Sequence, residues 1–214
     1  NNPGEAIFCY TKLTKLQPEN GEVWFTRGGL QFNTRDYEGA AVSLEKSVSL
    51  GCNAAESYRM LAKIYQIRKE YFKADSAYTR FEQELGAPDE PEYWFDKGKV
   101  MLKIGLKDAA FFDRAIEAFD KAIELDSTKE TYCEHAGLAR YYKNSKEYFS
   151  AAIPFFLKRI EIGGENVNSL RNLAFCYLKT ERYEKAAEYL EKAIALKPED
   201  CVMHQMIGKI YVFL

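Results

Sequence analysis

The chain has 214 residues, of which 47% are hydrophobic and 29% are charged, and its formal net charge is −2. This content of apolar side chains is typical of a folded protein and excludes a disordered linker. The slightly acidic balance disfavours nucleic acid as a partner, because phosphate backbones attract a basic surplus. No apolar run approaches the roughly 20 residues that cross a bilayer, so we expect a soluble chain without membrane insertion.

Two series of small residues recur along the chain at nearly constant spacing. The first series comprises Gly28, Ala62, Gly98, Gly137, Ala174 and Gly208, with steps of 34, 36, 39, 37 and 34 residues. The second series comprises Ala6, Ala40, Ala74, Ala115, Ala152 and Ala186. A repeat of this period indicates stacked helical hairpins, with one small residue on each helix.

The pattern predicts an all-α solenoid that forms a single domain over residues 1–214. We expect a lone helix over residues 3–17, helix pairs over 21–52, 55–86, 91–127, 130–163 and 167–198, and a lone helix over 201–214. This amounts to five full repeats with a half repeat at each end. The apolar stretch from Ile210 to Leu214 is one that a solenoid normally covers with a further helix. We therefore expect the natural protein to continue past Leu214, and we expect the uncapped helix to favour self-association.

Large residues accompany both series at fixed offsets. In the predicted first helix of a pair, a large residue such as Trp24, Tyr58 or Trp94 precedes the small residue by four positions. In the second helix, a large residue follows the alanine by four positions; these are Leu44, Tyr78, Phe119, Phe156 and Leu190. Offsets of four place both residues on one helical face. A small residue lets two helices approach closely, and the large neighbour fills the remaining volume.

These residues resemble the tetratricopeptide repeat family over nearly the whole chain. The resemblance is plainest from Val23 and Trp24 to Leu50, and from Leu170, Ala174 and Tyr177 through Tyr183, Ala186 and Ala193 to Pro198. It implies a right-handed superhelix of antiparallel helix pairs, in which the first helices line a concave surface that binds other proteins. Gln31 and Arg140 depart from the pattern, since the family prefers tyrosine at those places.

Two hairpins depart from the regular spacing. The step from the first series to the second is 12 residues in three pairs, but 17 from Gly98 to Ala115 and 15 from Gly137 to Ala152. We predict longer turns near residues 105–111 and 144–147, either as tolerated loops or as a lip that contacts a partner. Pro154 is predicted to lie in the first turn of its helix, and a helix that starts earlier must kink there.

The sequence carries no catalytic motif. It lacks a glycine-rich nucleotide loop, a phosphate-binding Gly-Lys-Ser/Thr and a Gly-x-Ser-x-Gly elbow. Neither His135 nor His204 has the second close pair of ligands that zinc sites require. We expect His204 to be a packed core residue and His135 to lie at the surface. The segment is therefore predicted to have no enzyme activity, no cofactor and no metal.

The five cysteines are widely separated and odd in number. They are Cys9, Cys52, Cys133, Cys176 and Cys201. Most lie in apolar segments that are predicted to be helical, which is typical of buried, reduced thiols. We therefore expect a cytoplasmic protein; the alternative is the bacterial periplasm, if a signal peptide has been removed.

The resemblance places the binding surface on the first helices. The residues predicted to line this groove are Phe25, Phe32, Arg59, Lys63, Phe95, Lys99, Lys103, Tyr141, Tyr142, Arg171, Phe175 and Lys179. Across the wider lining, seven basic residues face one acid, Glu134. A basic groove with aromatic side chains is suited to a protein segment that has acidic and apolar residues.

The leading hypothesis is therefore a protein-interaction scaffold. An alternative is a regulatory or substrate-recruiting arm of a multidomain enzyme whose catalytic domain lies beyond Leu214. A third interpretation, recognition of single-stranded RNA by helical repeats, calls for a basic chain. The net charge of −2 opposes it.

Overall fold

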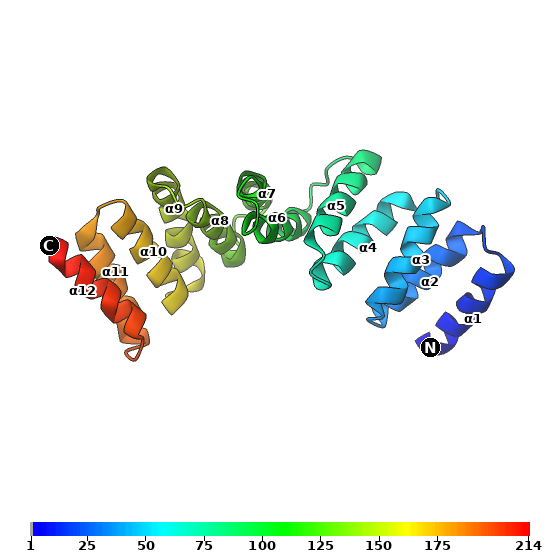
Figure 1. Ribbon diagram of the computed structural model, residues 1–214, viewed down its shortest axis with the longest axis horizontal. Coiled ribbons are helices and arrows are strands. Elements are labelled where there is room, and N and C mark those ends of the chain that lie inside the picture. The colour runs from blue at the N-terminus through cyan, green and yellow to red at the C-terminus, as the bar shows by residue number, and fades with distance from the viewer. Residues whose placement is uncertain (1) are drawn as a thin grey trace. The chain divides into compact units, whose positions relative to one another are not determined.

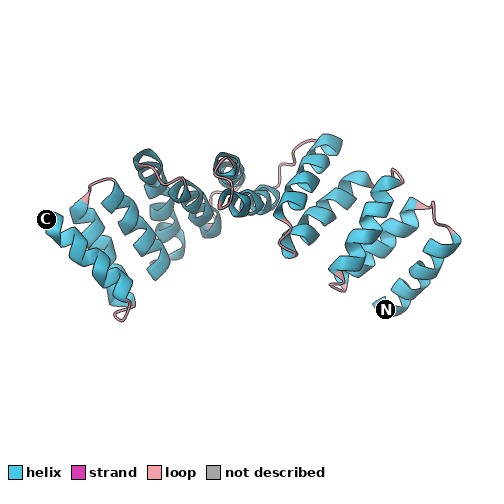
Figure 2. Cartoon of the chain, in the orientation of Figure 1, coloured by secondary structure: helices cyan, strands magenta, loops and turns pink. Residues whose placement is uncertain are grey.

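The computed structural model describes residues 2–214, which form twelve α-helices and no β-strand (Figures 1 and 2). The prediction of an all-α fold is confirmed. Several helices begin at a side chain that accepts a hydrogen bond from the first turn, as Asn2, Asp36, Ser145, Asn166 and Asp200 do. Such caps satisfy backbone N–H groups that have no partner inside the helix.

The chain divides into two compact units, one ending at Asp89 and the other beginning at Glu90. The first unit contains α1 (Pro3–Leu16), α2 (Gly21–Asn33), α3 (Tyr37–Ser49), α4 (Ala54–Ile67) and α5 (Tyr71–Leu85). The second unit contains α6 (Pro91–Gly105), α7 (Phe111–Leu125), α8 (Glu130–Tyr142), α9 (Lys146–Gly163), α10 (Val167–Lys179), α11 (Tyr183–Leu196) and α12 (Cys201–Phe213).

Consecutive helices pack into hairpins within each unit. The hairpins are α2/α3 and α4/α5 in the first unit, and α6/α7, α8/α9 and α10/α11 in the second. Figure 1 shows α10, α11 and α12 side by side at the C-terminal end. We call the even-numbered helices first helices and the odd-numbered helices second helices. First helices touch one another, α2 with α4 and α6 with α8, so each unit has a layer of first helices.

Each hairpin closes where a small residue of the first helix meets a large side chain of the second helix. A Cβ atom on Gly28 would come within 2.8 Å of Leu44, and one on Gly98 would come within 2.7 Å of the Phe119 ring. Gly137 would likewise meet Phe156 at 2.9 Å. Leu44, Phe119 and Phe156 are fully buried, and so are Ala62 and Ala174 in the other two hairpins. The small residues therefore stand at close helix contacts.

A polar link at one repeat position joins neighbouring hairpins. In the first helix, the linking residue lies three places after the small residue. Its partner lies in the preceding second helix, five places after the alanine. The pairs are Tyr65 with Glu45, Arg140 with Asp120, and Tyr211 with Glu191. Arg140 and Asp120 form an ion pair at 2.6 Å. Arg140 therefore forms the link that a tyrosine forms in the other two pairs.

Gln31 is the second residue that stands where the family has tyrosine, and it is buried with its own partners. Its side-chain oxygen accepts a hydrogen bond from the Ser43 hydroxyl at 2.6 Å, and its amide nitrogen donates to Asp36 at 2.8 Å. A buried amide is tolerated only when its donor and acceptor are both satisfied. The departure from tyrosine is therefore accommodated inside the α2/α3 hairpin.

Short turns inside the hairpins end the first helices in a left-handed residue. Arg35, Lys69, Asn144 and Glu181 have φ between 53° and 65°, and each is the middle residue of a three-residue turn. In three of these turns the next N–H donates to a carbonyl five residues back, at 2.8–2.9 Å. This is the Schellman arrangement, which satisfies carbonyls at a helix C-terminus.

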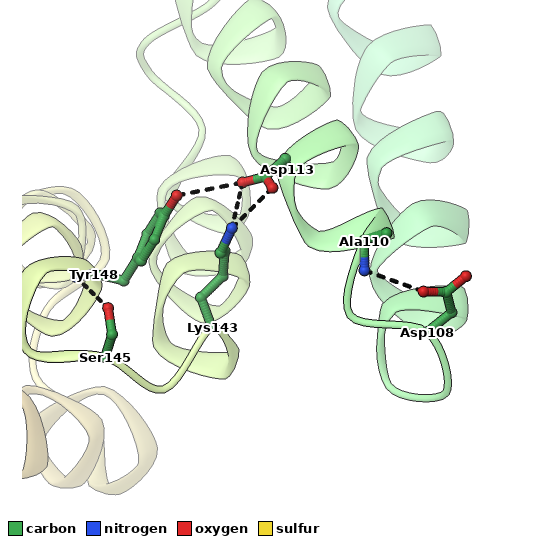
Figure 3. Close-up of polar contacts among 6 residues, drawn as sticks. All are labelled: Asp108, Ala110, Asp113, Lys143, Ser145 and Tyr148. Atoms are coloured by element: carbon green, nitrogen blue, oxygen red, sulfur yellow. Dashed lines mark hydrogen bonds and ion pairs between the residues drawn. The ribbon is translucent and has the colours of Figure 1, made fainter.

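One of the two predicted long turns is present, and the other prediction is wrong. Residues 106–110 form a five-residue turn between α6 and α7. Between α8 and α9 the turn has only three residues, because the extra residues lengthen the start of α9. Figure 3 shows how this start is fixed: Lys143 pairs with Asp113 of α7 at 2.6 Å, and the Tyr148 hydroxyl bonds to Asp113 at 3.4 Å.

The earlier start of α9 also corrects the position predicted for Pro154. This proline lies inside the helix rather than in its first turn. Proline has no N–H to donate to the carbonyl four residues back, which belongs to Ser150. Both Pro154 and Ser150 are exposed, so water can satisfy that carbonyl.

The sequence prediction of mostly buried thiols is wrong for part of the set. Cys133 and Cys176 are buried, Cys52 is half-buried, and Cys9 and Cys201 are exposed. All five are unpaired. Burial raises the pKa of the Cys133 thiol and raises the pKa of Cys176 to about 12. Buried and solvent-accessible thiols therefore coexist in the chain.

We predict that Gly28→Ala and Gly29→Ala, neighbours on α2, have opposite effects on stability. Alanine at Gly28 would press on the buried Leu44, so we expect a loss of about 1–3 kcal/mol in the free energy of unfolding. Nothing lies within 4 Å of a Cβ on Gly29, so alanine should stabilise the helix by about 0.5–1 kcal/mol. Urea denaturation measures both. Equal effects of the two substitutions would contradict the close contact at Gly28.

We predict that burial of Cys176 makes stability fall at alkaline pH. An unfolded thiol ionises near its ordinary pKa of 9.0, whereas the folded one resists ionisation up to about 12. The stabilisation is therefore complete below pH 9 and is lost as the pH rises, at up to about 1.4 kcal/mol per pH unit. Unfolding free energies measured at several pH values should show a shallower decline in Cys176→Ala. An identical decline in both proteins would refute the assignment to this thiol.

Candidate binding groove

The first helices α8, α10 and α12 of the second unit line a cavity of about 520 Å³. Its lining residues are Glu134, Leu138, Tyr141, Tyr142, Asn168, Arg171, Asn172, Phe175, Val202 and Met206. We call this cavity the α8–α10–α12 groove. It brings together Tyr141, Tyr142, Arg171 and Phe175, four of the residues proposed from the sequence. A cavity of this size can hold several side chains of a ligand.

Aromatic rings form one wall of the groove and are held by one another. The Tyr141 ring lies 5.2 Å from Phe175 and 5.6 Å from the buried Phe149, and the rings of Phe149 and Phe175 are 5.6 Å apart. Tyr142 meets Tyr141 edge to face at 5.6 Å. Burial raises the pKa of Tyr141, so its hydroxyl stays neutral at physiological pH. The wall is therefore a cluster of aromatic rings that pack on one another.

Polar side chains also line the groove. Arg171 is half-buried and donates a hydrogen bond to the amide oxygen of Asn168 at 3.4 Å. Among residues 2–214, no carboxylate pairs with Arg171. Asn172 adds a second amide, and Glu134 is the other charged residue of the lining. The groove thus holds one positive and one negative side chain, a balance that differs from the basic excess predicted for the whole concave surface.

The predicted residues of α6 lie outside this groove. Phe95 packs inside the second unit, with ring centroids 4.6 Å from Tyr132 and 5.8 Å from Phe119. Lys99 is engaged locally, because it pairs with Asp96 at 2.7 Å and lies 4.8 Å from the Phe95 ring. Lys103 is exposed. These contacts give Phe95 and Lys99 a structural role in the α6/α7 and α8/α9 region.

The predicted residues of the first unit have separate environments. Phe32 packs edge to face on Tyr37 at 5.9 Å, and the Arg59 guanidinium lies 6.0 Å from the Phe81 ring. Phe25 is half-buried and Lys63 is exposed. In the second unit, Lys179 is exposed, with its ammonium 5.2 Å from the ring of Phe175. Lys179 therefore stands beside the groove, although it does not line it.

The groove crosses the first helices obliquely, which explains the residues that sequence reasoning missed. On α8 the lining extends from three places before the small residue Gly137 to five places after it. On α10 it extends from six before Ala174 to one after, and on α12 it uses places six and two before Gly208. A constant set of repeat positions therefore omits four lining residues: Asn168, Asn172, Val202 and Met206.

The histidines do not form a site. His204 was expected in the core but is exposed, and its ring nitrogen hydrogen-bonds the Pro198 carbonyl at 2.7 Å. Trp24 makes the same contact with the Pro18 carbonyl at 2.8 Å, so the contact belongs to the repeat. His135 is half-buried, and its ring lies 5.0 Å from Phe95. The described part of the chain contains no group of three side chains that could hold a metal ion.

None of the helices in residues 2–214 is both long enough and apolar enough to span a bilayer.

Comparison with known proteins gives a match to the tetratricopeptide repeat model at residues 167–200. These residues contain α10 and α11, the hairpin whose first helix runs through the middle of the groove. Helix α10 therefore belongs both to the segment that matches the family model and to the lining of the groove.

Two relatives match over most of the chain. Anaphase-promoting complex subunit 3 of Schizosaccharomyces pombe is 23% identical over 208 residues, which covers 97% of this chain and 30% of the relative. A TPR repeat-containing protein of Methanocaldococcus jannaschii is 26% identical over 182 residues, with 79% of this chain and 30% of the relative covered. The chain therefore spans about 30% of the length of these relatives.

Solved structures share the fold at low identity. YrrB, described as a TPR protein with an unusual peptide-binding site, superposes with a TM-score of 0.75 at 19% identity and covers 92% of this chain and 96% of its own. MamA superposes with a TM-score of 0.69 at 19% identity, covering 86% of this chain and 95% of its own. The chain therefore has the fold of tetratricopeptide repeat proteins, and residues 167–200 match the model of that family.

Proposed function

We propose that the chain is a protein-interaction scaffold that binds a segment of a partner protein in the α8–α10–α12 groove. The observation that carries the proposal is the composition of this cavity, which combines packed aromatic rings with Arg171 and two amides. Aromatic residues and arginine are enriched at the energetic centres of protein interfaces. The description of YrrB as peptide-binding supports the same type of function in a chain of the same fold.

The groove suggests the chemistry of the segment. An apolar side chain would pack on Phe175, Leu138 and Met206. A neighbouring Asp or Glu of the partner would pair with Arg171, whose planar guanidinium suits a carboxylate. Asn168 and Asn172 each offer a donor and an acceptor, which an extended backbone can use. We therefore propose an extended segment with an apolar residue close to an acidic one.

The other predicted groove residues fit a wider version of this proposal. Lys179 beside the groove and Lys103 on α6 are exposed cations that could meet further acidic residues of a partner. Within the second unit they would extend the contact on either side of Arg171. The basic character proposed for the first-helix side of the second unit rests on these exposed lysines.

Self-association through α12 is a second proposal. Ile207 and Ile210 of this helix are buried against the α10/α11 hairpin. Phe213 is 62% exposed and stacks on Tyr183 at 4.9 Å, and Val212 is 82% exposed. Burying such apolar surface contributes roughly 25 cal/mol per Å², before the costs of association are subtracted. Another helix, of this protein or of a second copy, could cover these side chains.

The five unpaired thiols support the cytoplasm as the proposed location. Exposed thiols such as Cys9 and Cys201 are liable to oxidation in an oxidising compartment. A reducing compartment keeps them as thiols.

A peptide selection tests the binding proposal. A random peptide library displayed on phage is selected against the full chain, and enriched peptides are measured by fluorescence anisotropy. We expect peptides that combine apolar and acidic residues, and we expect Arg171→Glu to weaken them about tenfold or more, because the new carboxylate repels that of the peptide.

Arg182→Glu is the matched control, because Arg182 is exposed at the start of α11 and does not line the groove. It should leave the affinity within about twofold. Selected peptides that bind both charge-reversed variants as well as the unmodified chain would refute the groove as their site. So would a selection that enriches no peptide.

A further inference from the structure

A second hollow lies in the first unit, between the second helices α3 and α5 and above the first helix α4. Its volume is about 380 Å³. It is lined by Glu45, Val48, Tyr58, Leu61, Tyr65, Phe72, Lys73, Ser76, Ala77 and Arg80. We call it the α3–α5 pocket. None of its residues belongs to the set predicted to line the concave surface, and it is formed by the first unit alone.

One repeat position that holds a large side chain in α9 and α11 holds alanine in α5 and α7. Ala77 lies three places after the alanine of its helix, where α9 has Phe155 and α11 has Tyr189. In α10/α11, Tyr189 stacks on Tyr177 at 5.6 Å and covers it. In α8/α9, Phe155 lies under the Arg140 guanidinium at 4.1 Å. Ala77 cannot cover Tyr65 in this way, so the space beside Tyr65 stays open.

The α2/α3 hairpin fills the corresponding space by another route. Ser43 occupies the same repeat position and bonds to Gln31 at 2.6 Å. Ser43 is fully buried, so no opening is left there. The opening at Ala77 therefore reflects the side chain at that position and is not common to all hairpins.

The walls of the pocket are aromatic and partly open to solvent. Tyr58 is half-buried, Tyr65 is 7% exposed and Phe72 is 57% exposed. The Tyr65 hydroxyl donates to Glu45, which fixes the ring and engages that carboxylate. Three aromatic rings around a hollow of this size are suited to one inserted apolar side chain.

The charges at the rim favour an anionic neighbour for that side chain. Lys73 pairs with Glu70 at 2.7 Å, and Glu45 is bound to Tyr65. Arg80 donates only to the neutral amide of Gln83, at 3.4 Å, and no carboxylate in residues 2–214 pairs with it. An exposed guanidinium beside an apolar hollow is complementary to a carboxylate that follows an apolar group.

We propose that the α3–α5 pocket is a second docking site, which takes a protein segment with one aromatic or large aliphatic side chain next to an Asp or Glu. The apolar side chain enters between Tyr58, Tyr65 and Phe72, and the carboxylate pairs with Arg80. This site is independent of the α8–α10–α12 groove, which belongs to the other unit. A segment bound there would dock on the second-helix side of the first unit.

Titration by nuclear magnetic resonance tests the pocket with defined probes. The ¹⁵N-labelled full chain is titrated with the blocked dipeptide N-acetyl-phenylalanyl-glutamic acid amide and with its glutamine counterpart. We expect saturable shifts in α3, α4 and α5. Measured on these shifts, the glutamine peptide should bind about tenfold more weakly, because it lacks one charge-assisted contact. Equal affinity of both peptides for these helices, or no shifts there, would overturn the proposal.

Two variants separate the pocket from the fold. Ala77→Tyr introduces the side chain that Tyr189 supplies at the same repeat position of α11. It should abolish binding, because the tyrosine ring fills the hollow. Arg80→Gln should weaken the glutamic acid peptide about tenfold and leave the glutamine peptide unchanged. If Ala77→Tyr does not fold, Phe72→Ser removes an exposed wall instead and should weaken both peptides. Unchanged binding in these variants would overturn the proposal.

Sedimentation velocity decides whether a second copy of the chain is the occupant instead. We expect the unmodified chain and Ala77→Tyr to have the same association state. A dimer of the unmodified chain that Ala77→Tyr converts to a monomer would contradict the proposed peptide ligand.

Discussion

The contact on which each hairpin depends is that between a small residue of the first helix and a large, buried side chain of the second. Where that residue is glycine, there is no space for even one methyl group. The backbones therefore approach closely, and the position of one helix on the other is fixed by sterics rather than by polar contacts. Because the contact recurs with the repeat, the hairpins of each unit present their first helices to one layer of that unit. The polar links at Tyr65, Arg140 and Tyr211 then join one hairpin to the next.

Both candidate sites follow from this arrangement. With the core of each hairpin closed by the small–large contact, the remaining faces of the helices are available to vary. On the first-helix side, rings such as Tyr141 and Phe175 face the space between α8, α10 and α12. On the second-helix side, the residue three places after the alanine covers its neighbour at Tyr189, whereas Ala77 leaves the space beside Tyr65 open.

The sequence predicted the fold well because the fold depends on side-chain size at a fixed period. Gly98 and Phe119 identify a close contact even before any geometry is known. The sequence predicted the groove less well, because the lining residues occupy different repeat positions on α8, α10 and α12. A prediction that uses the same repeat positions on every first helix cannot follow this shift. Asn172 and Met206 were missed for this reason. The extra residues before Ala152 could equally lengthen a turn or a helix, and only the structure shows that α9 starts early, with Ser145 as its cap.

The central claim is that the small and large residues act as a single contact, and a double-mutant cycle on Gly137 and Phe156 tests it most directly. Alone, Gly137→Ala should cost about 1–3 kcal/mol by overpacking, and Phe156→Ala about 3–5 kcal/mol by opening a cavity. In the double variant the new methyl group enters the space that the ring has left. The account therefore predicts a combined loss smaller than the sum by more than about 1 kcal/mol. Losses that add to within about 0.5 kcal/mol would show that the two residues do not meet as described.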